Sequence, residues 1–350
     1  MQSDAIAGSI LGCAIGDAIG LPYEGLSKNR GIRLLGEPDQ MRFVFRHGMV
    51  SDDTEHTCMV AEALCDSPTD ADLFARSLAR RLRWWLCGLP AGIGFATLRA
   101  TLKLWLGFSP QRSGVFSAGN GPAMRSAVLG AAIDDLRQLR QFVHASTVIT
   151  HTDPKAFYGA FIVALAAWCA QRGLDESDDF FRQYHLVLEQ IPSNDLCKLI
   201  LEIEHSLASG DSTETFAEKM GCKNGVSGYV YHTVPVALYA WLSHPRDFRQ
   251  AVSAVVRCGG DTDTTGAIVG TIAGSAVGRE GIPSEWLSQL WEWPRSISWM
   301  ERLAEATSNA VANASPQPYP RVFPGTGLVR NALFMTTVLG HGMRRLLPPY

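Results

Sequence analysis

Glycines recur at every fourth position in two stretches of this 350-residue chain. The two sets are Gly8, Gly12, Gly16 and Gly20, and Gly266, Gly270, Gly274 and Gly278. A spacing of four places each set along one side of an α-helix. Because a glycine inside a helix costs about 1 kcal/mol relative to alanine, this pattern favours helices whose backbones approach one another closely. We expect the two helices to pack against each other or against the same central element.

Helical spacing of apolar residues dominates the rest of the chain, and no segment shows the sustained two-residue alternation of a half-buried strand. The clearest predicted helices cover residues 3–21, 70–86, 133–149, 154–171, 229–242, 247–257 and 328–339. Residues 25–48 carry little periodicity, and residues 306–326 have the Ser, Ala, Asn and Pro content of a linker. The sequence therefore predicts an all-α fold, a compact orthogonal multi-helix bundle, in one domain over residues 1–350.

Composition narrows the class of protein and its partners. The chain is 46% hydrophobic and 19% charged, as globular proteins are, and its net charge of −3 leaves no cationic surplus for a nucleic-acid backbone. The eight cysteines include no Cys-x-x-Cys pair, which disfavours a zinc site. The N-terminus lacks the cationic start of a signal peptide, and the longest apolar run, residues 266–278, is too short to cross a bilayer. We therefore expect a cytoplasmic protein without a stable nucleic-acid or membrane partner.

A turn rich in carboxylates and hydroxyls, residues 259–265 with the sequence GGDTDTT, precedes the second glycine-spaced helix. The simplest interpretation is a polar cap of that helix. A cap needs only one oxygen, however, whereas Asp261, Asp263 and three threonines offer five side chains. Oxygen-only clusters of this kind suit hard cations such as Mg²⁺ or Mn²⁺.

A second cluster of the same kind, residues 51–54 with the sequence SDDT, stands where another helical pattern begins. Together the two turns supply four carboxylates, enough to neutralise two divalent cations about 4 Å apart. Without cations, carboxylates that close would repel one another strongly. We therefore predict that the two turns meet, with Asp52 and Asp261 on the same side of the molecule.

Three further features are candidates for a substrate site. The segment 117–121 (SAGNG) precedes a predicted return to helix near residue 123, and glycines at a helix N-terminus expose N–H groups that can hold phosphate. His151 lies between two predicted helices, just before Pro154, and could equally be a capping or packing residue. Glu24 lies in the loop after Pro22 and could also be an ordinary surface residue. On spacing alone, the whole pattern suits a phosphatase, a nuclease or a nucleotide glycohydrolase.

The ordered set of motifs resembles the ADP-ribosylglycohydrolase family, which includes the dinitrogenase reductase-activating glycohydrolase. The matching segments are 16–20 (GDAIG) with Glu24, 51–54 (SDDT), 119–121 (GNG) with Met124 and Arg125, 150–151 (TH), 259–264 (GGDTDT) and 341–350 (HGMRRLLPPY). Each motif is weak alone, whereas the set in this order is specific and covers nearly the whole chain. One departure is Ser51, where many members have threonine; serine keeps the hydroxyl and loses a methyl group.

The resemblance implies roles for these residues. Two divalent cations, Mg²⁺ or Mn²⁺, would be held by Ser51, Asp52, Asp53, Asp261, Asp263 and Thr264. The diphosphate of ADP-ribose would lie on the glycine loop, and the implied substrate-binding residues are Ser117, Gly119, Asn120, Gly121, Met124 and His151. The implied catalytic residues are Asp53, which would activate the water or the leaving group, and Glu24, which would assist or gate at the mouth of the site.

The resemblance further implies hydrolysis of the glycosidic bond between the distal ribose of ADP-ribose and a modified protein side chain, with ADP-ribosyl-arginine as the favoured linkage. Nearby carboxylates would stabilise the oxocarbenium-like transition state. The alternatives are another linkage (serine, O-acetyl-ADP-ribose or a nucleic-acid base) or a protein that binds and masks ADP-ribose without turnover. The expected partners are an ADP-ribosylated protein as substrate and ADP-ribose as product.

Overall fold

The computed structural model describes residues 2–175, 177–188, 194–323, 325–346 and 348. Over these ranges the regular elements are helices, and β contacts are limited to isolated bridges such as the one between Val226 and Gly260. The predicted all-α class is therefore confirmed.

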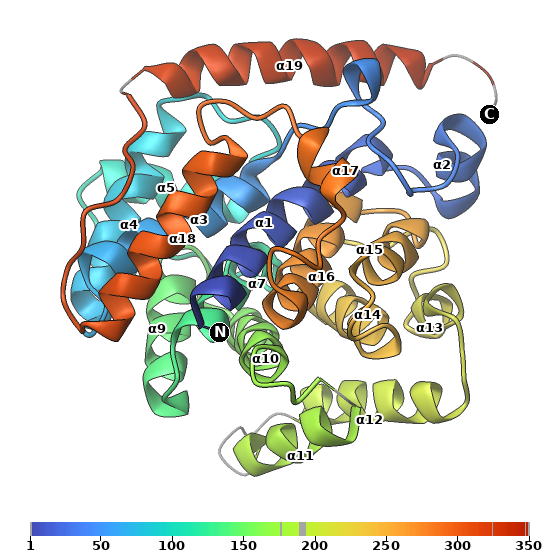
Figure 1. Cartoon of the computed structure of the whole chain (residues 1–350), viewed down its shortest axis with the longest axis horizontal. Coiled ribbons are helices and arrows are strands. Elements are labelled where there is room, and N and C mark those ends of the chain that lie inside the picture. The colour runs from blue at the N-terminus through green and yellow to red at the C-terminus, as the bar shows by residue number, and fades with distance from the viewer. Residues whose placement is uncertain (1, 176, 189–193, 324, 347, 349–350) are drawn as a thin grey trace.

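The helices are shown in chain order in Figure 1. They are α1 (Gln2–Gly20), η1 (Leu21–Tyr23), α2 (Lys28–Leu35), η2 (Val44–Arg46), α3 (Asp52–Asp66), α4 (Ala71–Leu86), α5 (Phe95–Trp105), α6 (Pro110–Ser113), α7 (Gly121–Met124), α8 (Ala127–Ala132), α9 (Leu136–Val148), α10 (Pro154–Ala170), α11 (Ser177–Leu188), α12 (Asn194–Ala208), α13 (Thr213–Lys219), α14 (Val230–Ser243), α15 (Phe248–Arg257), α16 (Thr262–Val277), α17 (Ser284–Ser288), α18 (Ile297–Ala312) and α19 (Thr326–Arg344).

The two glycine-spaced helices, α1 and α16, pack directly against each other at the centre of the molecule (Figure 1). A Cβ atom added at Gly12 would lie 2.1 Å from the carbonyl oxygen of Gly270, and one added at Gly16 would lie 2.0 Å from that of Gly266. Side chains larger than hydrogen are therefore excluded at these contacts. The predicted close approach of the two backbones is confirmed, and because the helices run antiparallel it brings the start of α16 to the end of α1.

The apolar character of α1 follows from its place in the core. By length and composition, residues 2–23 could cross a membrane, but 94% of that apolar window is buried inside the protein. α1 packs on α3, α8 and α18, while α16 packs on α10, α14 and α15. Buried apolar side chains from α1 to α18 form one connected cluster around this pair.

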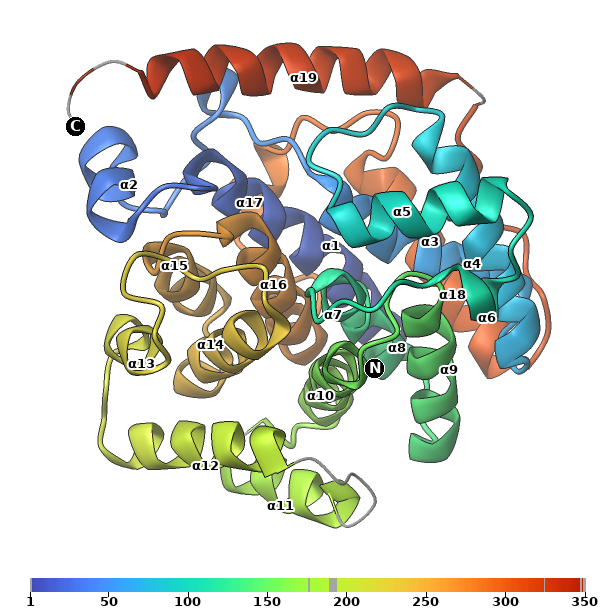
Figure 2. The ribbon, with the colours of Figure 1, turned by 180° about the vertical axis from the view of Figure 1, so that it is seen from behind.

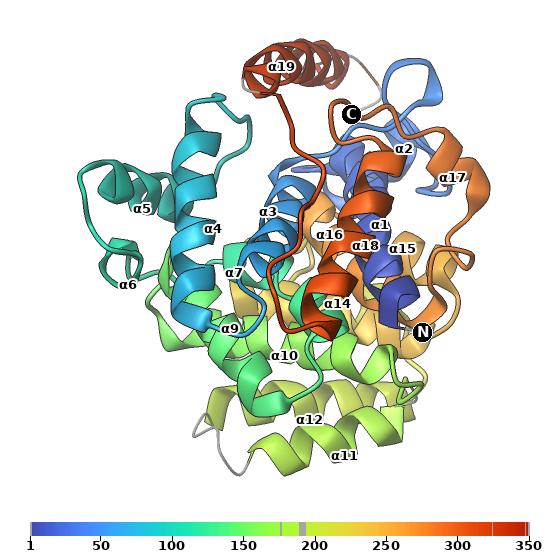
Figure 3. The ribbon, with the colours of Figure 1, turned by 60° about the vertical axis from the view of Figure 1, so that its left-hand side comes forward.

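The C-terminal helix α19 lies across one end of the molecule, far from α11 and α12 (Figure 3). Its inner side is largely polar: Arg330 pairs with Glu292 at 2.8 Å, and Asn331 donates to the carbonyl of Gly88. Phe334 joins the small apolar cluster beneath the helix. Polar contacts therefore fix α19 to the body of the protein.

Two segments predicted to be irregular contain helices. Residues 25–48 include α2 and η2, and α18 extends to residue 312, into the predicted linker. The small residues of 306–312 suggest a linker, but small side chains also suit a helix that packs closely on its neighbours. In α18, Leu303, Thr307 and Ala310 are buried at helical spacing.

The helices around the glycine loop are also shorter than predicted. Helix α9 begins at residue 136, not 133, because the side chain of Asp135 accepts a hydrogen bond from the backbone N–H of Gln138 and caps the helix there. The helix expected from residue 123 onward is divided into α7 and α8. The interruption falls at Arg125, whose side chain is fully buried.

Candidate active site

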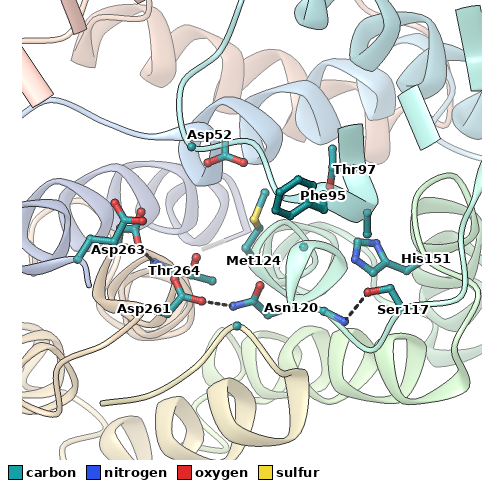
Figure 4. A pocket seen from close by; sticks show the side chains of 17 residues that line it. Asp52, Phe95, Thr97, Ser117, Asn120, Met124, His151, Asp261, Asp263 and Thr264 are labelled. Carbon is teal, nitrogen blue, oxygen red and sulfur yellow. Dashed lines mark hydrogen bonds between the residues drawn. The ribbon is translucent and has the colours of Figure 1, made fainter. Parts of the chain in front are cut away.

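A cavity of about 390 Å³ opens between the start of α3, the start of α16, the glycine loop and the segment before α5. Eleven of the predicted site residues line it: Glu24, Asp52, Ser117, Gly119, Asn120, Gly121, Met124, His151, Asp261, Asp263 and Thr264. In Figure 4 the acidic side chains lie at one end of the cavity, His151 and Ser117 lie at the other, and Asn120 lies between them. The two acidic turns therefore meet as predicted.

Ser51 and Asp53 are buried behind the cavity wall. The Ser51 hydroxyl donates to Oδ2 of Asp53 at 2.9 Å, and the Thr264 hydroxyl donates to the same oxygen at 3.3 Å. These bonds join the start of α3 to the start of α16. The other carboxylate oxygen of Asp53, Oδ1, is buried without a hydrogen-bond partner among the described residues.

The turn before α16 is held by backbone contacts that require glycine. Gly259 and Gly260 have φ of 72° and 85°, in the left-handed region. A Cβ atom at Gly260 would lie 2.1 Å from the carbonyl oxygen of Val226. The Gly260 N–H donates to the carbonyl of Leu26 at 2.8 Å, and the Asp261 N–H donates to that of Val226 at 2.8 Å. The turn is therefore fixed to the segment just after Glu24.

Asp17, within α1, holds the other turn and was not predicted as a site residue. Its carboxylate accepts hydrogen bonds from the Ser51 backbone N–H at 2.9 Å and from the Thr54 hydroxyl at 2.6 Å. The available signals were its place in the GDAIG motif and a carboxylate within the apolar part of α1, next to the glycine stripe. Since Asp17 satisfies groups at the α3 N-terminus, it orients the side chains that follow.

Burial dominates the electrostatics of the acidic end. It raises the pKa values of Asp52, Asp53 and Asp263 well above their usual range, and neighbouring carboxylates raise them further. Burial also raises the pKa of Asp17 to about 7. The pKa of Glu24 is raised by burial and then by Asp261, with Arg345 acting in the opposite direction. Several carboxylates share this region with little cationic compensation, which disfavours full ionisation.

The donor atoms of the acidic end are of the kind that a hard cation prefers, although the side chains are not arranged around a single point. Its donors are carboxylate and hydroxyl oxygens, which Mg²⁺ and Mn²⁺ prefer, and Oδ1 of Asp53 is an unpaired buried acceptor. Over the part of the chain that the structure describes, no group of three or more His, Cys, Asp or Glu side chains is placed to hold one metal ion.

The glycine loop is tied to the acidic turn by Asn120. Its side-chain N–H₂ donates to Oδ2 of Asp261 at 2.7 Å and to the Thr233 hydroxyl at 3.1 Å (Figure 4 shows the first bond). The backbone N–H of Gly119 donates to the Ser117 hydroxyl at 3.3 Å. Helix α7 has only four residues, so its dipole would contribute less to phosphate binding than the sequence suggested.

His151 is held at the opposite end by a buried chain of polar contacts. Its Nδ1 lies 2.9 Å from the Thr150 hydroxyl, which accepts a hydrogen bond from Arg125 at 2.8 Å. Arg125 also donates to Ser146. Burial, reinforced by the nearby Arg125 charge, lowers the pKa of His151 to about 3. The ring is therefore neutral at physiological pH.

The lining residues of the segment 92–97 were missed by sequence analysis. Phe95 is 85% exposed at the rim, and Thr97 is buried beside it. This segment begins α5, for which no helix was predicted. The only available signal was a pair of glycines, Gly92 and Gly94, before an aromatic residue.

A family model described as ADP-ribosylglycohydrolase matches residues 1–317. The chain belongs to the ADP-ribosylglycohydrolase family. It is therefore a hydrolase of that family, as the resemblance of its motifs predicted. The match stops before α19, so the segment 341–350, which was part of the resemblance, lies outside the matched region.

The relatives each cover more than four fifths of the chain. An uncharacterized protein of Archaeoglobus fulgidus is 34% identical over 303 residues, covering 84% of this chain and 93% of that protein. ADP-ribosylhydrolase ARH3 of Xenopus tropicalis is 26% identical (85% and 93% covered), and the ADP-ribosyl-dinitrogen reductase glycohydrolase of Rhodospirillum rubrum is 25% identical (82% and 90%). A solved ADP-ribosylglycohydrolase-related protein complex matches with a TM-score of 0.64 and 26% identity, covering 89% of this chain and 99% of that one.

Proposed function

We propose that this protein is a metal-dependent hydrolase that removes ADP-ribose from a modified protein side chain, with arginine as the favoured acceptor. The observation that carries the proposal is the meeting of two acidic turns and the glycine loop around one cavity. The names of two relatives, an ADP-ribosylhydrolase and an ADP-ribosyl-dinitrogen reductase glycohydrolase, support the removal of ADP-ribose.

The acidic end would hold two divalent cations, Mg²⁺ or Mn²⁺. Their proposed ligands are Ser51, Asp52, Asp53, Asp261, Asp263 and Thr264. When bound, the cations would supply positive charge that grips the hydroxyls of the distal ribose and orients a water molecule. The unpaired Oδ1 of Asp53 and the raised pKa values of the neighbouring aspartates support such a site.

The chain's own carboxylates would act on the reacting centre. Glu24 and Asp52 line the cavity, so they are placed to contact a water molecule or the leaving group there. Asp53, which is buried behind Thr264, would support water activation from the cation site without touching the substrate. Negative charge at this end would also stabilise the positive charge that develops on the ribose carbon.

The opposite end would hold the rest of ADP-ribose. Backbone groups of the loop at Gly119 and Gly121 would face the diphosphate, with Ser117, Asn120 and Met124 beside it. Because His151 is neutral, it can donate or accept one hydrogen bond without adding charge to this end. The separation of an acidic end from a neutral end would fix the direction in which ADP-ribose enters.

The decisive experiment measures release of labelled ADP-ribose from arginine-linked, serine-linked and O-acetyl substrates, with Mg²⁺, with Mn²⁺ and with EDTA. We expect release from the arginine-linked substrate that EDTA abolishes and either cation restores. Metal-dependent binding of ADP-ribose in calorimetry without turnover of any substrate would instead make this protein a binding protein. Turnover that is unchanged in EDTA would overturn the metal assignment.

A further inference from the structure

Charge is distributed unevenly along this chain. Residues 73–133 contain eight arginines and lysines and no aspartate or glutamate, although the whole chain has a net charge of −3. This carboxylate-free segment comprises most of α4, then α5 and α6, and the glycine loop that lines the cavity. Figure 2 shows α4, α5 and α6 together on one side of α7. Four of these cations, Arg76, Arg80, Arg99 and Arg112, are exposed, so the surface beside the acidic site carries positive charge.

The outward side of α5 is apolar as well as cationic. Phe95, Arg99, Leu102 and Leu106 recur at helical spacing and are all exposed, whereas Ala100, Thr101 and Leu104 on the other side are buried. Phe95 lines the cavity, so this stripe starts at the cavity and follows α5 for about 15 Å. Figure 3 shows α5 and α6 as the outermost elements on their side of the molecule.

Two more exposed phenylalanines extend this surface. Phe116 is 78% exposed and directly precedes Ser117 of the cavity, and Phe108 lies beneath the Lys103 ammonium, 5.2 Å from ring centroid to nitrogen. Lys103 also donates to the carbonyl of Gly114 at 2.9 Å, which joins α5 to the segment leading into the glycine loop. We name the set the rim surface: Phe95, Arg99, Leu102, Leu106, Phe108 and Phe116. Exposed apolar groups gathered on one surface mark interaction sites.

We propose that the rim surface binds the polypeptide that carries the ADP-ribosyl group, through apolar and acidic residues beside the modified side chain. The proposal rests on the proposed function. If the distal ribose lies at the acidic end, the acceptor must leave the cavity through its mouth, where Phe95 lies exposed and where Phe116 directly precedes the lining residue Ser117. A macromolecular acceptor then lies across the elements that border this mouth.

The chemistry of the rim surface favours a polypeptide over a nucleic acid. Leu102 and Leu106 are exposed aliphatic groups, 48% and 78% respectively, and a sugar–phosphate backbone offers little apolar surface to cover them. Apolar side chains of a polypeptide would bury them, while its carboxylates would pair with the exposed Arg99 and Arg112. The partner is therefore an acidic and partly apolar stretch of protein.

The test compares one macromolecular and one small substrate. The variants Leu106→Glu and Arg99→Glu are assayed on an ADP-ribosylated polypeptide with acidic and leucine residues near the modified arginine, and on ADP-ribosyl-arginine alone. We expect KM for the polypeptide to rise about tenfold or more in each variant. For the small substrate, kcat and KM should both stay unchanged. The matched control is Leu201→Glu on α12, an exposed leucine (55%) on a distant helix.

Each other outcome is also decisive. Equal losses on both substrates, or no loss on the polypeptide, would overturn the proposal. Tighter binding of single-stranded oligonucleotide than of the polypeptide by the wild type, lost in Arg99→Glu, would assign the surface to nucleic acid and overturn it as well. If the wild type hydrolyses neither substrate, the proposed function fails on its own; fluorescence anisotropy of the labelled polypeptide with wild type and Leu106→Glu then still decides whether the rim surface binds it.

Discussion

Asp17 is a carboxylate in the last turn of a largely apolar helix, α1, and its contacts explain why it is there. It accepts hydrogen bonds from the backbone and the side chain of Thr54 and from the backbone of Ser51. In the Asp17→Asn variant, an amide N–H₂ group would face these donors, and the start of α3 would lose its orientation. Residues that orient metal ligands typically contribute 10–100-fold to metal affinity.

We therefore predict that Asp17→Asn raises the Mg²⁺ concentration for half-maximal hydrolysis by about 10–100-fold. The measurement is a Mg²⁺ titration of ADP-ribose release. Asp4→Asn, at the other end of α1 near Arg279, is the matched control and should behave as wild type. An unchanged Mg²⁺ requirement in Asp17→Asn would show that Asp17 serves the fold alone.

His151 provides a second prediction at this scale. Because its pKa is lowered to about 3, the ring should stay neutral from pH 8 down to pH 5. The unfolded chain takes up a proton near pH 6.5, so the stability that this neutral ring contributes is present above that pH and declines as the pH falls. The measurement is the ¹⁵N chemical shift of His151 across this range, with the urea-unfolded protein as reference. A titration of the folded protein near pH 6.5 would contradict the prediction.

Sequence reasoning found residues whose chemistry is concentrated locally and missed those that act singly. Asp52 and Asp261 belong to short polar clusters, which is why they could be selected before any fold was known. Asp17, Phe95 and Thr97 lie outside such polar clusters. The packing of α1 on α3 places Asp17 against the start of α3, and the position of α5 brings Phe95 and Thr97 to the cavity.

At the scale of helices, the α1–α16 pair positions the acidic turns. Its closest contacts are between the two backbones, which leave no room for an added side-chain atom. A Cβ atom at Gly12 would lie 2.1 Å from the carbonyl oxygen of Gly270. Rigid backbone on both sides cannot move away as a flexible side chain could. The two helices would have to separate along their length to admit a methyl group.

We predict that Gly12→Ala lowers the free energy of unfolding by about 3 kcal/mol or more, measured by urea denaturation. Gly340→Ala on α19 is the control, because no atom lies within 4 Å of its added Cβ. That substitution should raise stability by up to about 1 kcal/mol, since alanine favours helix over glycine. Similar effects of the two substitutions would mean that α1 and α16 are not closely packed.

The central pair could be predicted because its signal is a strict spacing within each helix. Elements that depend on distant partners could not. The end of α18 has the composition of a linker, and its Ser, Ala and Asn residues gain helical stability only by packing on α1 and α3. The start of α5, after Gly94, has no side-chain cap hydrogen bond, so its sequence carries no clear start signal.

Helix α19 lies beyond the matched family region and yet contacts the loop that carries Glu24. Arg345, directly after α19, donates to the carbonyl of Glu24 at 2.6 Å and to that of Pro22 at 2.9 Å. His341 also contacts the Pro22 carbonyl at 2.9 Å. The C-terminal region therefore holds in place a carboxylate that lines the cavity.

We predict that Arg345→Gln lowers kcat/KM for ADP-ribose release by about tenfold, the equivalent of roughly 1.4 kcal/mol for the lost charged hydrogen bonds. Arg344→Gln, an exposed neighbour, is the matched control and should retain wild-type kinetics. Steady-state assays of both variants at saturating Mg²⁺ make the comparison. If both variants lose activity equally, the effect is one of overall charge and not of the Glu24 loop.

For the whole molecule, the carboxylates that would bind cations also destabilise the folded protein. Asp53 is buried with one unpaired oxygen, and Asp17, Asp52 and Asp261 raise its pKa further. Carboxylates so close destabilise the fold when they are charged and no cation is present. Sites built for function commonly carry this kind of stability cost. A bound divalent cation would remove the repulsion and stabilise the native state by mass action.

Wild type and the Asp53→Asn variant should therefore respond differently to Mg²⁺ and to its removal. Wild-type protein should melt at a higher temperature with Mg²⁺ than with EDTA, with a gain of about 2.7 kcal/mol when Mg²⁺ is at one hundred times its Kd. In EDTA, Asp53→Asn should be more stable than wild type by about 0.5–2 kcal/mol, because the amide cannot ionise beside the neighbouring carboxylates, and Mg²⁺ should then stabilise it less. Asp178→Asn, at an exposed position on α11, should match wild type in both conditions. Calorimetric melting of the three proteins tests the argument: a wild type indifferent to Mg²⁺, or an Asp53→Asn variant less stable than wild type in EDTA, would show that the acidic end is a structural network and not a cation site.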